Sequence, residues 1–151
     1  MIKNPGEINL DEALNICKEA LKKGRELDLM PLTVTVIDIA GVTRATLSEE
    51  GSSLMRPEMA YAKAWSCLAL NVSTNTMRDM FESMPRLAPA ARGIQTMAGG
   101  KLFPTPGGML IQKDGKNIGA VGVTGDVSDQ DEICAIAGIE SSHLTPGHKS
   151  I

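Results

Sequence analysis

Apolar and small side chains recur at helical spacing near the start of the chain. Between residues 10 and 21 they stand three, four and seven positions apart, which is the spacing of one buried face of a helix. Asn9 precedes this segment and Glu12 follows three residues later, a pair that caps a helix reciprocally. The pattern predicts a helix from this cap to about Leu27. Its buried face is expected to carry Leu10, Ala13, Leu14, Cys17, Ala20 and Leu21.

The next two apolar segments predict a hairpin. Leu32–Asp38 and Val42–Leu47 have the composition of strands and flank a turn at Ala40-Gly41. Successive side chains of a strand face opposite sides of a sheet. In the first strand one side carries Leu32, Val34, Val36 and Asp38, and the other carries Thr33, Thr35 and Ile37. Asp38 is interpreted as a turn former, with a functional acid as the alternative.

A second hairpin is predicted near the end of the chain, at the centre of the sheet. Met109–Lys113 and Lys116–Val123 flank Asp114-Gly115, a dipeptide that readily takes the positive φ angles of a type I′ turn. Three glycines mark the second strand and its end: Gly119, Gly122 and Gly125. Because glycine weakens a strand, this spacing indicates that a helix or a ligand approaches the backbone closely.

The last apolar segment predicts a helix from Asp129 to about Glu140. Ser128–Asp131 resembles a capping box that opens it. Its apolar face is expected to carry Ile133, Ile136 and Ala137. His143 and His148 follow in a tail, where they are either metal or haem ligands or, in the simpler interpretation, solvated tail residues.

The middle of the chain predicts a helix that is apolar nearly all the way round. Pro57 can begin it, and residues 59–72 show the composition of a buried helix. Lys63 is the exception, and Arg56 lies on the same stripe two turns earlier. The Lys63 ammonium either reaches the surface or lies at the edge of a pocket. In the second case Arg56 and Lys63 form a two-point clamp for a carboxylate or a phosphate, while Glu58 points elsewhere and caps or pairs locally.

Two further segments follow this helix. Met77, Met80 and Met84 form an apolar stripe that is expected to lie in the core, and residues 87–97 fit either a short helix or a turn. Residues 102–108 contain two prolines and two glycines, which predict a fixed loop. The backbone N–H groups of Gly107 and Gly108 are expected to face a ligand.

Composition narrows the class of protein. At 151 residues the chain fits one domain, residues 1–151. A net charge of −3 with interspersed signs argues against nucleic acid and membrane partners, and no apolar run reaches about 18 residues, so a cytoplasmic protein is expected. Three distant cysteines fit core positions better than a disulfide or zinc site, and no metal site is predicted. Nine methionines and 3% aromatic residues predict a core that adapts to ligands of irregular shape.

Five sequence blocks, in this order, resemble the GlcG/HbpS-like haem-binding family, which also supplies the C-terminal domain of PduO-type proteins. Together with the first helix they cover nearly the whole chain. The blocks are VTVIDIAG (34–41), RPEMAYAKA (56–64), PGGMLI (106–111), DGKNIGAVGVTG (114–125) and DQDEICAIAGI (129–139).

The resemblance implies an α/β (α+β) sandwich like the profilin and Roadblock folds, with a five-stranded antiparallel sheet flanked by helices. It also implies a homo-oligomer built from dimers, up to an octamer, with ligand sites at subunit boundaries. Some branches of the family bind haem or related tetrapyrroles.

The resemblance also carries over the residues of a polar pocket. They are Arg56, Glu58, Lys63, Gly107, Gly108, Thr124 and Gly125. The chain departs from haem-binding relatives in having no histidine before His143, so an iron ligand would be a histidine of the tail, a methionine or the Thr124 hydroxyl.

Three functions follow from these features. The first is a binding protein for haem or a related anionic tetrapyrrole or small ligand in an oligomeric assembly. The second is a small cofactor-independent enzyme, an isomerase, lyase or hydrolase, that acts on a carboxylated metabolite with Lys63, Asp38 or Glu58 as acid or base. The third is a structural assembly unit in which these residues form a subunit interface.

Overall fold

The computed structural model describes residues 7–148. The single domain expected over residues 1–151 includes a few residues at each end that lie outside this range. The elements in chain order are α1 (Leu10–Glu26), β1 (Thr33–Asp38), β2 (Thr43–Ser48), α2 (Arg56–Leu70), α3 (Thr74–Ser83), the 3-10 helix η1 (Pro85–Leu87), α4 (Ala88–Met97), β3 (Gly108–Lys113), β4 (Lys116–Thr124), α5 (Ser128–Ser141) and β5 (Thr145–Gly147). The first cap is confirmed, because Asn9 and Glu12 bond each other's backbone N–H groups.

The strands form one antiparallel sheet in the order β2-β1-β4-β3-β5. Both predicted hairpins are present, and the pairing of β1 with β4 joins them, with Thr33 opposite Thr124. In the second hairpin, Asp114 has a φ of 51° and Gly115 a φ of 74°, as the predicted turn requires. The predicted fold class, an α+β sandwich around a five-stranded antiparallel sheet, is therefore confirmed.

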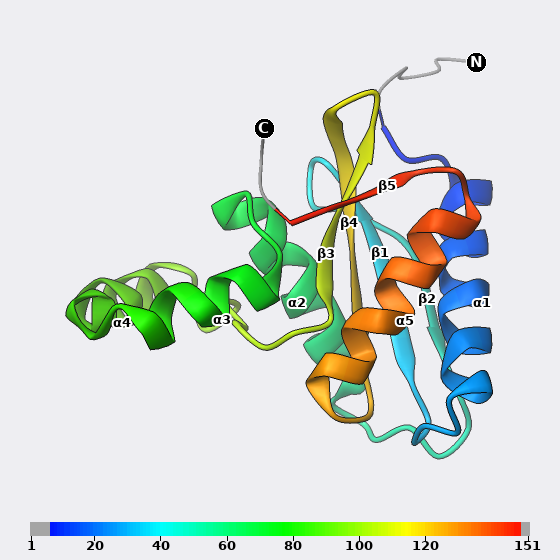
Figure 1. The fold of residues 1–151 in the computed structure, drawn as a ribbon, viewed down its shortest axis with the longest axis horizontal. Helices are drawn as coiled ribbons and strands as arrows, with labels where there is room; N and C mark the ends of the chain where they lie inside the picture. Colours follow the sequence, from blue (N-terminus) through cyan, green and yellow to red (C-terminus); the bar gives the residue numbers. More distant parts are fainter. Residues whose placement is uncertain (1–6, 149–151) are drawn as a thin grey trace.

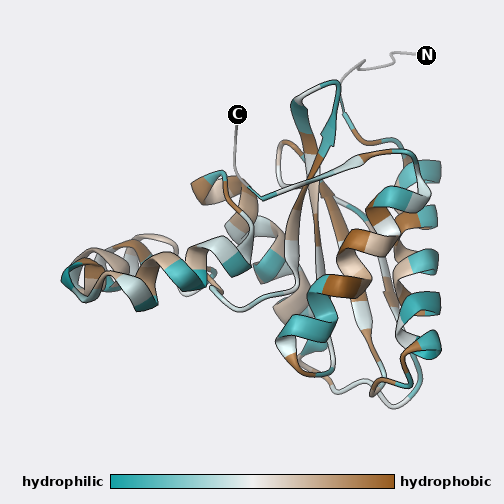
Figure 2. Ribbon diagram, in the orientation of Figure 1, coloured by the Kyte–Doolittle hydropathy of each residue, from teal (hydrophilic) through white to brown (hydrophobic). Residues whose placement is uncertain are grey.

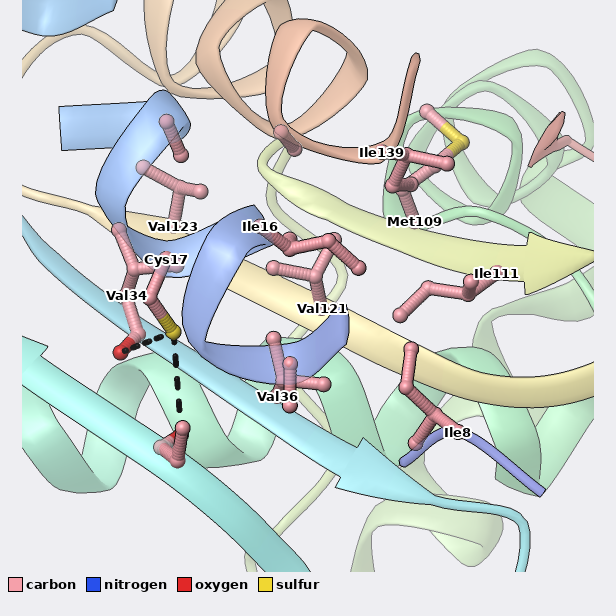
Figure 3. Packing of buried hydrophobic residues seen from close by; sticks show 14 of the residues in the cluster. Ile8, Ile16, Cys17, Val34, Val36, Met109, Ile111, Val121, Val123 and Ile139 are labelled. Carbon is pink, nitrogen blue, oxygen red and sulfur yellow. Dashed lines mark hydrogen bonds between the residues drawn. The ribbon is translucent and has the colours of Figure 1, made fainter. Parts of the chain in front are cut away.

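Helices cover both faces of the sheet. Figure 1 shows α1 and α5 side by side on one face and α2 on the other. The larger core lies under α1 and α5, where Val34 and Val36 of β1 meet Ile16 of α1 (Figure 3). On the other face, Ile37 packs with Ala64 of α2. The expected alternation along β1 is therefore confirmed. Figure 2 shows hydrophobic colouring in the middle parts of the central strands of the sheet.

Helix α2 lies so close to the sheet that one strand needs a glycine. A Cβ atom at Gly122 would collide with the backbone carbonyl of Ala60, and one at Gly119 would collide with that of Ile37 in β1. The close approach indicated by the glycine spacing is therefore made by a helix and a strand of the protein itself.

The tail after α5 differs from the prediction. Residues 145–147 form β5, which pairs with the edge of β3, with Leu110 opposite Gly147. The His148 carbonyl then accepts a hydrogen bond of 2.8 Å from the N–H of Ser73, the N-cap of α3. His143 and His148 are exposed, as the simpler interpretation expected. The strand was not predicted, because three residues are too few to show the alternating pattern of a strand.

The segment of α3, η1 and α4 projects away from the sandwich (Figure 1). We call these residues, 74–97, the arm. Residues 88–97, which fitted either a helix or a turn, are helical, and α4 has no buried residue. The methionine stripe was expected in the core, but only Met77 is buried, while Met80 and Met84 are 41% and 40% exposed. Correct helical spacing therefore did not mean burial here, because the arm has no second layer above it.

Three expectations for the helices facing the core are wrong. Leu10 is 56% exposed and Ile133 is 42% exposed. The inner face of α5 instead carries small residues such as Gly138, where a Cβ atom would meet Ile16 of α1, because the two helices pack closely. Helix α5 also lacks the expected capping box, since its N-cap is Val127. Within residues 7–148, no helix is long and apolar enough to cross a membrane.

Candidate functional site

Lys63 of α2, which the sequence pattern placed either at the surface or at the edge of a pocket, forms a buried ion pair with Asp131 of α5. The Lys63 ammonium donates to Asp131 Oδ2 at 3.0 Å and to the Val123 carbonyl at 2.9 Å. Both side chains are almost completely buried, 2% and 1% exposed. Lys63 thus neither reaches the surface nor lies at the edge of a pocket.

Arg56 extends this interaction to the end of β4. Its guanidinium donates to Thr124 Oγ1 at 2.8 Å and to the Gly125 carbonyl at 3.4 Å. The second oxygen of Asp131 accepts from the backbone N–H of Asp126 at 3.1 Å. We call Arg56, Lys63, Thr124, Gly125 and Asp131 the internal polar network, which ties the first half of α2 to the junction between β4 and α5.

Burial acts in opposite directions on the pKa values of the two ion-pair partners. It lowers the pKa of Lys63 and raises the pKa of Asp131, because an interior of low polarity disfavours both charges. The attraction between the partners and their hydrogen bond act against burial in each case. Arg56 lowers the pKa of both groups.

The two glycines of the 102–108 loop complete the same region. A Cβ atom at Gly107 would lie 2.9 Å from Lys63 Nζ, so glycine leaves room for the ammonium. The N–H of Gly108 donates to Thr74 Oγ1 at 2.8 Å. The expectation that this N–H faces a ligand is therefore wrong, because a threonine at the start of α3 already accepts its hydrogen bond.

The structure thus brings six of the seven predicted residues together, but around Asp131 and in the interior. The predicted two-point clamp, in which Arg56 and Lys63 bind a ligand anion, is wrong, because the Lys63 ammonium is paired with Asp131 of the protein itself. The pattern Ser128–Asp131 predicted a capping box, so the role of Asp131 in the ion pair was not predicted. A signal was present: Asp131, Cys134, Ala135 and Gly138 stand three, four and seven residues apart and form the buried face of α5. A carboxylate on such a face calls for an internal partner.

A separate pocket of about 600 Å³ lies beside the face of α2 that carries Glu58, Tyr61 and Ala62, and Arg56 and Lys63 do not line it. Its floor is the face of β1 and β2 that α2 leaves uncovered, where Thr35 and Thr46 bond each other through their hydroxyls at 2.9 Å. Its walls include Met55 and Met59 of the α2 end and Phe103 from the segment after the arm. Most of the surface of this pocket is therefore apolar, with hydroxyls at its floor.

Few charged groups line the pocket. Glu58, on the first turn of α2, supplies a carboxylate, and it is the one member of the seven predicted residues that lies here. Lys101 supplies an ammonium, held 4.7 Å from the centre of the Trp65 ring. The Tyr61 hydroxyl donates to the Gly41 carbonyl at 3.2 Å. No sequence pattern indicated Lys101, because it stands alone between a glycine pair and the 102–108 loop.

The other candidate groups do not form a site. Asp38 accepts from the N–H groups of Ala40 and Val42 and pairs with Arg44, so it is a turn former, as interpreted. Cys17, Cys67 and Cys134 are buried free thiols. Among residues 7–148, no group of three histidine, cysteine, aspartate or glutamate side chains is placed to hold a metal ion. His143 and His148 lie outside the lining of the pocket.

Solved structures share this architecture. The chain superposes on a structure described as a PduOC:heme complex with a TM-score of 0.78 and 23% identity, over 95% of this chain and 99% of that chain. It superposes on HbpS with a TM-score of 0.76 and 22% identity, over 92% of each chain. At this level of identity the similarity shows the fold.

Comparisons of sequence lead to the same group of proteins as the comparisons of structure. The chain is 24% identical over 127 residues to the corrinoid adenosyltransferase PduO of Salmonella typhimurium, over 84% of this chain but 36% of that protein. It thus spans about a third of the relative's length. A family model described as haem degrading protein HbpS-like matches residues 8–140. The chain therefore belongs to the HbpS-like family, which is related to the C-terminal domain of PduO.

Proposed function

We propose that this protein binds haem or a related anionic tetrapyrrole in the pocket between α2, the β1–β2 face and residues 99–103. The observation that carries the proposal is the pocket itself, whose volume of about 600 Å³ falls within the range of small-molecule sites and whose walls are mostly apolar. Membership of the HbpS-like family and the haem complex of a structural neighbour support the choice of ligand.

The side chains of the pocket fit such a ligand. Met55, Met59 and Phe103 offer adaptable apolar contacts to a flat ring. Thioether and phenol groups are among the axial ligands that proteins give to haem iron, so Met59 and Tyr61 are the residues to test for this role. Bound haem would supply a redox-active iron, and these side chains would set its access to solvent and its orientation.

The internal polar network has a supporting role in this proposal. Arg56 and Lys63 donate to Thr124, Gly125 and Val123 at the end of β4 and so fix the first half of α2, which forms one wall of the pocket. The alternative of an enzyme with Lys63 as its base loses its motive, because the ammonium donates to two buried oxygens.

Titration of the purified protein with haemin tests the proposal. A Soret band that shifts and saturates is the expected result. Met59→Leu and Tyr61→Phe then identify the iron ligand, because loss of that ligand changes the Soret position while the apolar contacts are kept. A spectrum that stays that of free haemin throughout the titration would overturn the proposal.

We further propose that the arm contacts a second copy of the chain in a homo-oligomer. Met80, Met84 and Met97 are exposed on it by 41%, 40% and 82%, and a helical projection without a packing layer is typical of an interface. Light scattering on Met84→Glu/Met97→Glu tests this, with a smaller assembly as the expected result and an unchanged mass as the contrary one. The cytoplasmic location stays a prediction.

A further inference from the structure

The two charged side chains of the pocket, Glu58 and Lys101, lie beside opposite ends of one stripe of α2. Glu58, Tyr61, Ala62 and Trp65 stand at spacings of three, four and seven residues, so they form one stripe of the helix. Glu58 is exposed at one end of this stripe. Lys101 lies over Trp65 at the other end, and seven residues of helix separate the two ends by about 10 Å.

The backbone of Lys101 is anchored while its ammonium is not. The N–H of Lys101 donates to the Ala98 carbonyl at 3.2 Å. The Ser66 hydroxyl, which donates to the Ala62 carbonyl at 2.7 Å, accepts from the N–H of Phe103 at 2.8 Å and lies 3.4 Å from the Lys101 carbonyl. Among residues 7–148 no carboxylate pairs with the Lys101 ammonium, which lies against the face of Trp65. An exposed cation over a ring is weakly held and can turn toward a stronger anionic partner.

Glu58 has the opposite charge to Lys101 and therefore repels a ligand carboxylate. Its carboxylate is exposed and lines the same pocket, so a ligand carboxylate placed at that end would face a like charge. A ligand with apolar bulk and carboxylates on one edge is therefore favoured in one orientation and disfavoured in the reverse one.

The geometry points to Lys101 as the residue that binds the carboxylate edge of the ligand, and to Glu58 as the residue that rejects the reverse orientation. This inference rests on the proposed function and deepens it, since it defines the ligand class as flat, mostly apolar molecules whose acidic groups share one edge. When such a ligand binds, the Lys101 ammonium leaves the Trp65 ring and pairs with a carboxylate.

Paired titrations test the assignment. Haemin and its dimethyl ester, which lacks both carboxylates, are titrated in the same detergent into the full chain and into Lys101→Gln, Lys101→Arg and Glu58→Gln. Lys116→Gln serves as the matched control, because it removes an exposed lysine that lies outside the pocket. Circular dichroism checks that each variant is folded.

The expected result is selective for the ligand charge. Lys101→Gln weakens haemin binding by about two- to fivefold, as loss of a partly exposed ion pair does, and leaves binding of the ester unchanged. Lys101→Arg stays within about twofold of the wild type and Glu58→Gln strengthens haemin binding by roughly two- to threefold, because both keep or improve the attraction for the acid edge. Lys116→Gln behaves as the wild type.

Two other outcomes overturn different claims. If Lys101→Gln binds haemin as the wild type does, or loses haemin and ester equally, the assignment of Lys101 is wrong while haem binding stands. If the wild type binds neither compound, the proposed function fails, and the assignment fails with it.

Discussion

The ammonium of Lys63 lies 3.0 Å from Oδ2 of Asp131, and neither side chain is more than 2% exposed. A charge without its partner in such a place is costly, whereas a pair of apolar residues of similar volume often replaces a buried ion pair with little loss. The pair is therefore a sensitive point of the link between α2 and the start of α5.

Removal of one partner should destabilise the fold far more than removal of both. Lys63→Met or Asp131→Leu alone should lower the free energy of unfolding by about 3–5 kcal/mol, because the remaining ionisable group is buried without its partner. The double variant Lys63→Met/Asp131→Leu should recover most of that loss. Urea unfolding of the wild type and the three variants measures the coupling.

Lys22→Met is the control for this cycle. It breaks a pair with Glu19 whose lysine is 65% exposed, and it should change the unfolding free energy by less than about 0.5 kcal/mol. Two single losses that simply add in the double variant would show that Lys63 and Asp131 do not stabilise each other.

Substitution of two glycines should have opposite effects. Gly122→Ala should destabilise the protein by about 1–3 kcal/mol or more, because the new methyl group meets the Ala60 carbonyl and α2 has to move. Gly93→Ala, in α4, should stabilise it by about 0.5–1 kcal/mol, because nothing lies near the added atom and alanine favours a helix. Thermal unfolding compares the two, and a tolerated Gly122→Ala would argue against the close packing of α2.

The contribution of Glu132 to stability should fall as the pH rises. Burial raises the pKa of Glu132 above its ordinary value of 4.5, with His148, Asn75 and Arg78 acting against burial and Asp129 acting with it. The folded protein thus holds this proton more tightly than the unfolded chain. The contribution is largest below pH 4.5 and is lost as the pH rises through the folded pKa, with a slope of at most about 1.4 kcal/mol per pH unit.

Urea unfolding at a series of pH values measures this effect as the difference between the wild type and Glu132→Gln. His148→Gln should move the decline to higher pH, because His148 lowers the pKa of Glu132. A difference that is constant or rises over this range would contradict the assigned direction.

Filling the pocket should block haem binding without harming the fold. Ala62 lies in the lining and is half-buried, so Ala62→Trp should occupy much of the space and weaken haemin binding by at least about tenfold, as unrelieved steric overlap does. Ala69→Trp is the matched control, because Ala69 is exposed on the same helix and does not line the pocket. A Soret titration of both variants decides, and equal affinities would place the ligand elsewhere.

Local patterns predicted most of the sandwich. The Asn9 cap, the two hairpins and the alternation of Val34 with Thr35 each depend on neighbours in the sequence, and the structure confirms all three. The close approach at Gly122 was predicted as well, since a glycine within a strand often marks a place where another backbone comes near. The wrong expectations concern exposure, because whether Met80 is buried depends on which layer lies above it.

The site was harder to predict for the same reason. Arg56 and Lys63 were correctly grouped with Thr124, but Asp131, the partner of Lys63, is 68 residues away along the chain and looked like a helix cap. Conversely, Lys101 lies in a segment without periodicity, and its place beside Trp65 results from the return of the chain after the arm. Spacing reveals which residues share a face, whereas the pairing of faces comes from the tertiary structure.

The short strand β5 protects the rest of the sheet. It occupies the outer hydrogen-bonding edge of β3, and the carbonyl that follows it holds the first turn of α3. A protein shortened before Thr145 would present bare amide and carbonyl groups along an apolar strand, which is a template for strand addition by neighbouring molecules. Thr145–Gly147 thus covers an edge at which neighbouring molecules could add a strand, and His148, the next residue, steadies the base of the arm.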